Sequence, residues 1–163
     1  MKSPFFVIIV CALAACTTVP PSGNNTGTEE KLVQAMPAGY KVGFQNRQGD
    51  VLTTEMIPAS QQIESWKEMI TAQIFYGGVP QKTPTGFFNA MDAGLKQRCY
   101  VSVNNIVEKG IDNGYPFAVW QQSCRIRTRN GQTTEEWAWV KAIQGDRNFY
   151  VVQKASKSRP GPL

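Results

Sequence analysis

Apolar and polar residues alternate along much of the chain beyond residue 100, as expected of strands that bury one face. Clusters rich in Gly, Asn and Asp separate the alternating segments and favour turns. We therefore predict strands over Tyr100–Lys109, Phe117–Arg129, Glu135–Ile143 and Phe149–Lys154.

Two shorter β-prone runs come earlier, Tyr40–Phe44 and Val51–Ile57, and a turn-like cluster joins them. We interpret this pair as a hairpin. The segment that follows is ambiguous, because its apolar spacing fits both a helix and a strand. We predict a helical turn over Ile63–Met69 that leads into a strand ending at Tyr76.

One segment has clear helical spacing, from about Pro84 to Arg98. Thr83 or Thr85 can cap its first turn with a hydroxyl, and the basic residues of its last turn suit the helix dipole. Its apolar face consists of Phe87, Phe88, Met91 and Leu95.

These elements predict an α+β domain, in which an antiparallel sheet of about 6–7 strands packs with one main helix over about 84–98 and a short second helix. The element order loosely resembles the PsbP-like fold of photosystem extrinsic proteins, which some bacterial lipoproteins share. The resemblance covers element order alone, so it implies a fold and no activity.

The best-defined local signal is Asn130-Gly131, a dipeptide typical of a two-residue type I′ hairpin turn. Such a turn predicts three cross-strand pairs: Arg125 with Glu136, Cys124 with Trp137, and Gln122 with Trp139. Alternation puts Arg125, Arg127 and Arg129 on one strand face, and Trp120, Cys124 and Ile126 on the other.

The N-terminus has the form of an export signal. Lys2 precedes an apolar stretch over Phe5–Leu13, which is too short to span a bilayer but fits a signal-peptide core. The following Leu13-Ala14-Ala15-Cys16 resembles the bacterial lipobox at all four positions. The resemblance implies that Cys16 becomes an acylated N-terminus and anchors the protein to a membrane.

The predicted organisation follows from this signal. Residues 1–15 form the lipoprotein signal peptide, 16–30 a lipidated and flexible tether, 31–156 a single periplasmic domain, and 157–163 a tail. An aspartate directly after the lipidated cysteine resembles an inner-membrane retention signal, but this chain has Thr17 there. The absence of the aspartate favours the outer membrane. The inner membrane and the cell surface remain open as alternatives.

Cysteine usage agrees with an exported domain. Cys11 leaves with the signal peptide and Cys16 carries lipid, so Cys99 and Cys124 remain as an even pair in an oxidising compartment. We predict a structural disulfide between them. A redox-active pair is the alternative, although its usual Cys-x-x-Cys spacing is absent.

Charge distribution indicates a binding surface near the C-terminus. The chain of 163 residues has a net charge of +5 and no histidine, which removes the usual general base and most zinc chemistry. From residue 125 onward there are eight basic and three acidic residues, a difference of +5. Arg125, Arg127 and Arg129 therefore suggest an anionic envelope component or an envelope protein as partner. A solvated sheet face is the alternative.

Trp137 and Trp139 share one strand face and alternate with small residues, so they are our candidates for an exposed contact surface, with burial in the core as the alternative. We expect an interaction protein rather than an enzyme, without cofactor, metal or nucleic acid. A small-molecule or lipid carrier predicts instead a cavity lined by some of Phe87, Phe88, Met91 and Trp120. An enzyme inhibitor predicts a rigid exposed loop over Gly110–Pro116.

Overall fold

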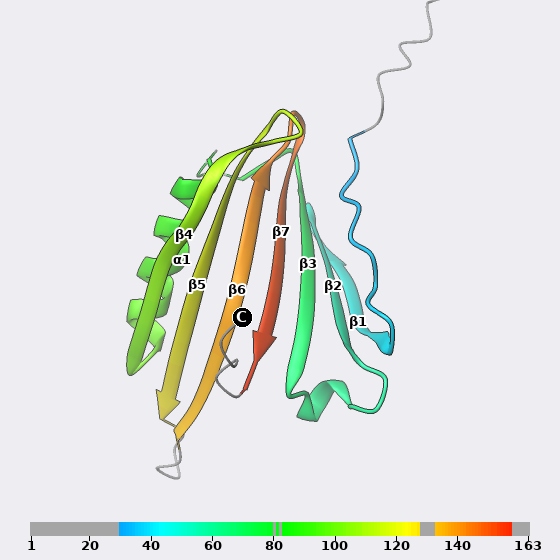
Figure 1. The fold of residues 1–163 in the computed structure, drawn as a ribbon, viewed down its shortest axis with the longest axis vertical. Coiled ribbons are helices and arrows are strands. Elements are labelled where there is room, and N and C mark those ends of the chain that lie inside the picture. The colour runs from blue at the N-terminus through cyan, green and yellow to red at the C-terminus, as the bar shows by residue number, and fades with distance from the viewer. Residues whose placement is uncertain (1–29, 80, 82, 128–132, 158–163) are drawn as a thin grey trace, which may run out of the picture.

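The α+β class predicted from the sequence is confirmed by the computed structural model, which describes residues 30–79, 81, 83–127 and 133–157. Within this part of the chain, seven strands form one antiparallel sheet in the order β1-β2-β3-β7-β6-β5-β4 (Figure 1). The elements are β1 (Tyr40–Gln48), β2 (Val51–Pro58), the 3-10 helix η1 (Ile63–Ser65), β3 (Glu68–Tyr76), α1 (Pro84–Arg98), β4 (Val101–Asp112), β5 (Tyr115–Arg127), β6 (Thr133–Gln144) and β7 (Asn148–Ser156).

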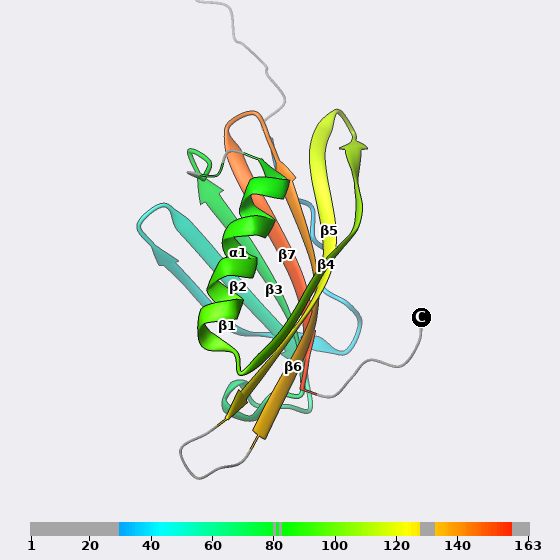
Figure 2. The same cartoon turned by 90° about the vertical axis from the view of Figure 1, so that its left-hand side faces the viewer.

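Helix α1 carries the chain from β3, in the middle of the sheet, to β4 at its far edge. It therefore crosses one face of the sheet and packs on β4, β5 and β6 (Figure 2). The predicted cap at Thr83 is confirmed, because its hydroxyl oxygen accepts the Gly86 N–H at 3.0 Å. Pro84 follows in the first turn, where a helix needs no N–H donor.

The core lies between α1 and this face of the sheet. Trp120, Phe149 and Val140 are almost completely buried there, and the predicted apolar face of α1 packs against them. The ring centroids of Phe88 and Trp120 are 5.6 Å apart, and those of Phe87 and Phe149 are 5.2 Å apart. Edge-to-face and tilted aromatic contacts of this kind add about 0.5–1.5 kcal/mol each beyond area burial.

A disulfide between Cys99 and Cys124 joins the end of α1 to β5, as the sequence predicted. The two Cα atoms are 5.3 Å apart and the cysteines are 25 positions apart in the chain. Closing a loop of this length stabilises the fold by about 3.5 kcal/mol in the chain-entropy account. The bond fixes the helix over the strand that holds Trp120.

The predicted loop over residues 110–116 is wrong. β4 continues to Asp112 and β5 begins at Tyr115, so only Asn113-Gly114 connects the two strands. Both residues have positive φ, 52° and 87°, as a type I′ turn requires. The sequence therefore contains a second Asn-Gly hairpin signal, and the expected rigid loop is two residues long.

The ambiguous segment before β3 also differs from its prediction. Its helical part is limited to η1, and Met69 belongs to β3, where it is buried. β3 is hydrogen-bonded to β2 on one side and to β7 on the other. Pairing on both edges therefore overrides the helical spacing of its apolar residues.

Candidate contact face

The predicted contact residues that the structure describes lie on one face of the sheet. Alternation from the buried Ala138, Val140 and Ala142, which lie under α1, turns Trp137 and Trp139 to the opposite side. In the register of β5 and β6, Trp137 pairs with Ser123, and Arg125 pairs with Glu135. Arg125, Arg127, Trp137 and Trp139 therefore share the face that α1 does not cover, and Arg129 lies outside the described residues.

We call this surface the contact face. It also includes two exposed residues of β4, Val101 and Val103, whose exposed fractions are 43% and 45%. Valines and tryptophans next to arginines combine apolar area with charge, which is the composition of many protein-binding surfaces. The contact face therefore spans β4, β5 and β6.

The tryptophans divide between core and contact face. Trp120 is completely buried, and its indole N–H donates to the side-chain oxygen of Gln122 at 3.0 Å. Trp66 packs against the core from the loop after η1. Trp137 and Trp139 are only partly buried. Core placement therefore explains Trp120 and Trp66 alone.

Both described arginines of the contact face are held by neighbours. The Arg125 guanidinium donates to the Glu135 carboxylate at 2.9 Å, and the side chains are 43% and 31% exposed. Arg127 lies over the ring of Tyr100, 4.8 Å from its centroid. The arginine side chains thus have defined positions, which reduces the entropy lost when a partner binds.

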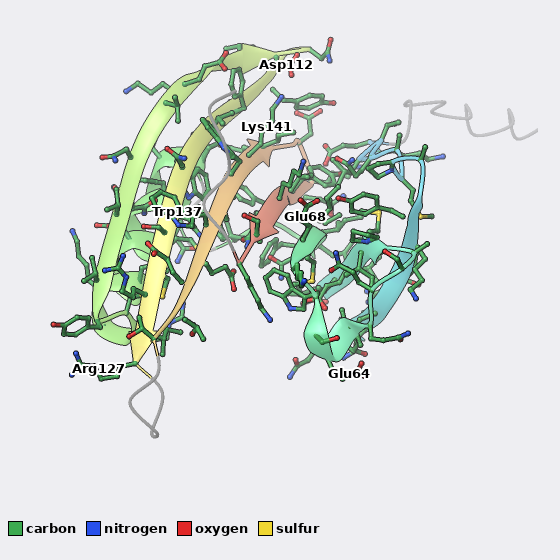
Figure 3. The ribbon with its side chains drawn as sticks, turned by 60° about the horizontal axis from the view of Figure 1, so that its bottom comes forward. Glu64, Glu68, Asp112, Arg127, Trp137 and Lys141 are labelled. Carbon is green, nitrogen blue, oxygen red and sulfur yellow. A yellow bond between two sulfur atoms is a disulfide. The ribbon has the colours of Figure 1, made fainter. Side chains whose placement is uncertain are left out.

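The far end of this face carries a second ion pair. Lys141 donates to the Asp112 carboxylate at 2.8 Å, and its ammonium lies 4.8 Å from the centroid of the Phe117 ring. Figure 3 shows Lys141 and Asp112 at one end of the sheet and Arg127 at the other, with Trp137 between them. Charged side chains therefore lie at both ends of the contact face, on either side of Trp137.

The predicted strand register is wrong by one residue. Arg125 pairs with Glu135 rather than Glu136, and Cys124 pairs with Glu136 rather than Trp137. Gln122 pairs with Ala138 rather than Trp139. The predicted Asn130-Gly131 turn falls outside the described residues, but the pairing of Arg127 with Thr133 around it does not fit a two-residue turn.

This register places Glu136 on the side of the sheet that faces α1. Burial raises the pKa of its carboxyl, and the nearby Lys157 ammonium lowers it only in part. The predicted register paired Glu136 with Arg125, so the position of Glu136 on the α1 side of the sheet was not predicted. The sequence did contain a signal for this position. Glu136 is two residues from Ala138 and four from Val140, and residues at even spacing share a strand face.

The aromatic residues expected to line a carrier's cavity contact one another beside the first half of α1. Phe87, Phe88 and Trp120 form a packed cluster there. Met91, one turn further along, lines a groove of about 610 Å³ beside the C-terminal half of the helix. The structure thus separates a solid core from an open groove along one helix.

The described residues contain no group of three or more His, Cys, Asp or Glu side chains placed to hold a metal ion. Among these residues, no helix combines the length and apolar character needed to cross a bilayer. No protein-family model matches the chain, and no curated protein matches its sequence.

Proposed function

We propose that this chain is a lipid-anchored protein of the bacterial envelope, attached through Cys16, whose domain binds another envelope component through the contact face. The observation that carries the proposal is the gathering of Arg125, Arg127, Trp137 and Trp139 on the helix-free face of the sheet. The partner is an envelope protein or an anionic envelope molecule. The lipobox supports attachment to the outer membrane with the domain in the periplasm.

The composition of the contact face supports a macromolecular partner. Tryptophan and arginine are the residues that most often dominate binding energy at protein interfaces. The apolar side chains lie on a face of the sheet, so a partner whose surface follows that face can cover them. Val101 and Val103 extend this area to the edge of the sheet.

The direct test is recovery of partners by the full, anchored chain from solubilised envelopes. The triple variant Arg125→Glu, Arg127→Glu and Arg129→Glu reverses the charge of the three arginines that the sequence predicts to make the contact. We expect the triple variant to lose the partner that the unchanged protein recovers. The variant Trp139→Ala tests the apolar part of the contact face separately, and we expect it to weaken recovery.

A matched control reverses charge elsewhere. Lys41→Glu and Lys96→Glu change basic residues of β1 and α1, away from the contact face. We expect this control to recover the same partner as the unchanged protein. Equal recovery by the triple variant and the control would remove the basic residues from the proposed function.

A further inference from the structure

The two edges of the sheet, β1 and β4, differ in their protection against pairing with another chain (Figure 1). Within the described part of the chain, each of these strands pairs on one side only, so the backbone groups of its outer side have no partner strand. Natural edge strands resist association through charged side chains, prolines and β-bulges. β1 contains Lys41, Arg47 and a bulge between Val42 and Phe44. The edge formed by β1 is therefore protected.

The first half of β4 lacks these features. Val101–Ile106 contains no charged residue and no proline, and its pairing with β5 is regular. The bulge of β4 comes only afterwards, between Ile106 and Glu108. The side chains of Val101 and Val103 are exposed. A regular, uncharged edge with exposed apolar side chains is a template on which another strand can pair.

Asn104, in the middle of this segment, has a side chain without a polar partner. Its carboxamide nitrogen and oxygen are both shielded from water, and neither meets a hydrogen-bond partner among the described residues. Buried carboxamides normally have partners, because otherwise they lose their hydrogen bonds to water without replacement. Asn104 pairs with Gln122 and so lies on the α1 side of β4. A strand added at this edge would bring new polar groups to Asn104.

We propose that two copies of this chain pair through their β4 strands, antiparallel, about a two-fold axis at Val103. Residues that are directly opposite in an antiparallel pair share a face of the sheet, so the axis passes through a residue and not between two. With the axis at Val103, this residue lies opposite Val103 of the second copy. Val101 then lies opposite Asn105, and Asn104 lies opposite Ser102.

This register accounts for the exposed and the unpartnered side chains of β4. Val103 packs against its own copy, and apolar pairs that are directly opposite stabilise neighbouring strands. The hydroxyl of Ser102 both donates and accepts hydrogen bonds, so it satisfies the Asn104 carboxamide of the other copy once this group turns toward the edge. Asn104 is only half-buried as a residue, which leaves its side chain room for that rotation.

Charges along β4 favour the same arrangement. Near the beginning of the strand, the Arg127 guanidinium lies over the ring of Tyr100. Beyond the bulge, Glu108 pairs with Val119 on the side of the contact face, and among the described residues no ion pair involves its carboxylate. Antiparallel pairing about Val103 brings Glu108 of each copy toward Tyr100 and Arg127 of the other. Opposite charges therefore meet at both ends of the paired segment.

The pairing joins two seven-stranded sheets edge to edge. Because opposite residues share a face, the contact faces of the two copies become continuous on one side, and both α1 helices lie on the other side. The pairing is a property of the chain itself and needs no envelope component. Its test is therefore separate from that of the proposed function, in which Trp139→Ala changes β6 and leaves β4 intact.

Disulfide crosslinking of the full-length chain in detergent tests the register. Copper phenanthroline oxidises single-cysteine variants, and a non-reducing gel measures the covalent dimer. We expect Val103→Cys to form the dimer in most of the protein, because each cysteine lies opposite its own copy. In Asn105→Cys the two cysteines would be roughly 14 Å apart, too far for a disulfide. We expect this matched control, which also reports chance sharing of a micelle, to give only the background of the unchanged chain.

A charge exchange tests the contact between Glu108 and Arg127 of different copies. Glu108→Arg and Arg127→Glu should each raise the dissociation constant of the dimer by about tenfold, as measured by sedimentation in detergent. The double variant should restore it to within about twofold. Glu64→Arg, an exposed change in η1, should have no effect. Circular dichroism checks that each variant is folded.

Three results would overturn the proposed pairing. The first is an unchanged chain that sediments as a monomer at every concentration measured. The second is a folded Val103→Cys protein that crosslinks no more than Asn105→Cys. The third is a double variant of Glu108→Arg and Arg127→Glu that dissociates as readily as the single variants. Each of these results leaves the proposed function standing, because recovery of an envelope partner does not depend on the dimer.

Discussion

The hydroxyl of Tyr150 donates a hydrogen bond of 2.7 Å to the carboxylate of Glu30 and so joins the beginning of the described chain to β7. Glu30 also accepts the backbone N–H groups of Asp146, Arg147 and Asn148 in the turn between β6 and β7. Burial raises the pKa of Glu30, but these hydrogen bonds outweigh it and the pKa is lowered overall. The last residue of the predicted tether is therefore bound to the fold.

This arrangement predicts a dependence of stability on pH. Because the folded-state pKa of Glu30 is lowered, its contribution is present above the ordinary value of 4.5 and is lost as the pH falls through the folded-state pKa. As the pH is lowered below 4.5, we expect the free energy of unfolding to fall less in Glu30→Gln than in the unchanged protein. Urea unfolding at pH 6 and at acidic pH measures this, with Glu64→Gln as an exposed control. Parallel pH curves for the unchanged protein and Glu30→Gln would contradict it.

Tyr150 gives the corresponding behaviour in alkali. Burial and the bond to Glu30 raise its pKa to about 12, from an ordinary value of 10.0. Its contribution is therefore complete below pH 10 and is lost as the pH rises through about 12. An absorbance titration of tyrosinate should show a late component near pH 12, and Tyr150→Phe should remove that component. Burial and Glu68 also raise the pKa of Tyr40, and that shift should be the same in both proteins. A Tyr150→Phe protein that keeps the late component would contradict the assignment.

The strand register can be tested through the ion pair of Arg125 and Glu135. A double-mutant cycle with Arg125→Ala and Glu135→Ala should give a coupling of about 0.2–1 kcal/mol, the range of partly exposed pairs. The same cycle with Glu136→Ala should give none, because Glu136 lies on the opposite face. Thermal or urea unfolding supplies the free energies. Coupling to Glu136 instead would restore the register predicted from the Asn-Gly turn.

This register marks the limit of what the sequence could predict. Alternation alone correctly separated Arg125 and Arg127 from Trp120, because side chains two positions apart share a strand face. Cross-strand partners depend in addition on the length of the connecting turn, and a one-residue difference changes every partner. For that reason the position of Glu136 beside α1 was not predicted.

Other features could not be predicted from any short stretch of sequence. The pairing of β3 with β7 joins segments far apart in the chain, so no short pattern in either strand specifies it. The contacts of Glu30 likewise depend on a turn more than a hundred residues later. In contrast, the helix over 84–98, its Thr83 cap and the disulfide follow local rules of spacing, capping and cysteine usage.

The division of the tryptophans predicts unequal costs of truncation. Trp120→Ala leaves a cavity in the core next to Phe88 and should lower the unfolding free energy by about 3–5 kcal/mol. Trp139→Ala, on the contact face, should cost about 1–2 kcal/mol, because a partly exposed side chain loses less buried area. Urea unfolding compares the two variants. Equal costs would place Trp139 in the core.

The proposed anchor is tested by Cys16→Ser, which removes the sulfur to which we propose the lipid is attached. We expect this variant to leave the membrane fraction, because two acyl chains are needed for stable attachment. Sedimentation of membranes, followed by detection of the chain in pellet and supernatant, measures the change. Cys11→Ser is the matched control and should remain in the pellet. A Cys16→Ser protein that sediments with the membranes would rule out this anchor.

The proposed binding of an envelope component by the contact face is tested most directly by site-specific photo-crosslinking in intact cells. The photoreactive residue p-benzoylphenylalanine replaces Trp139 on the contact face or Ala93 on the exposed side of α1. We predict a crosslinked product of one defined mass from position 139 and none from position 93. A product from position 93 alone, or no product from either position, would contradict the claim.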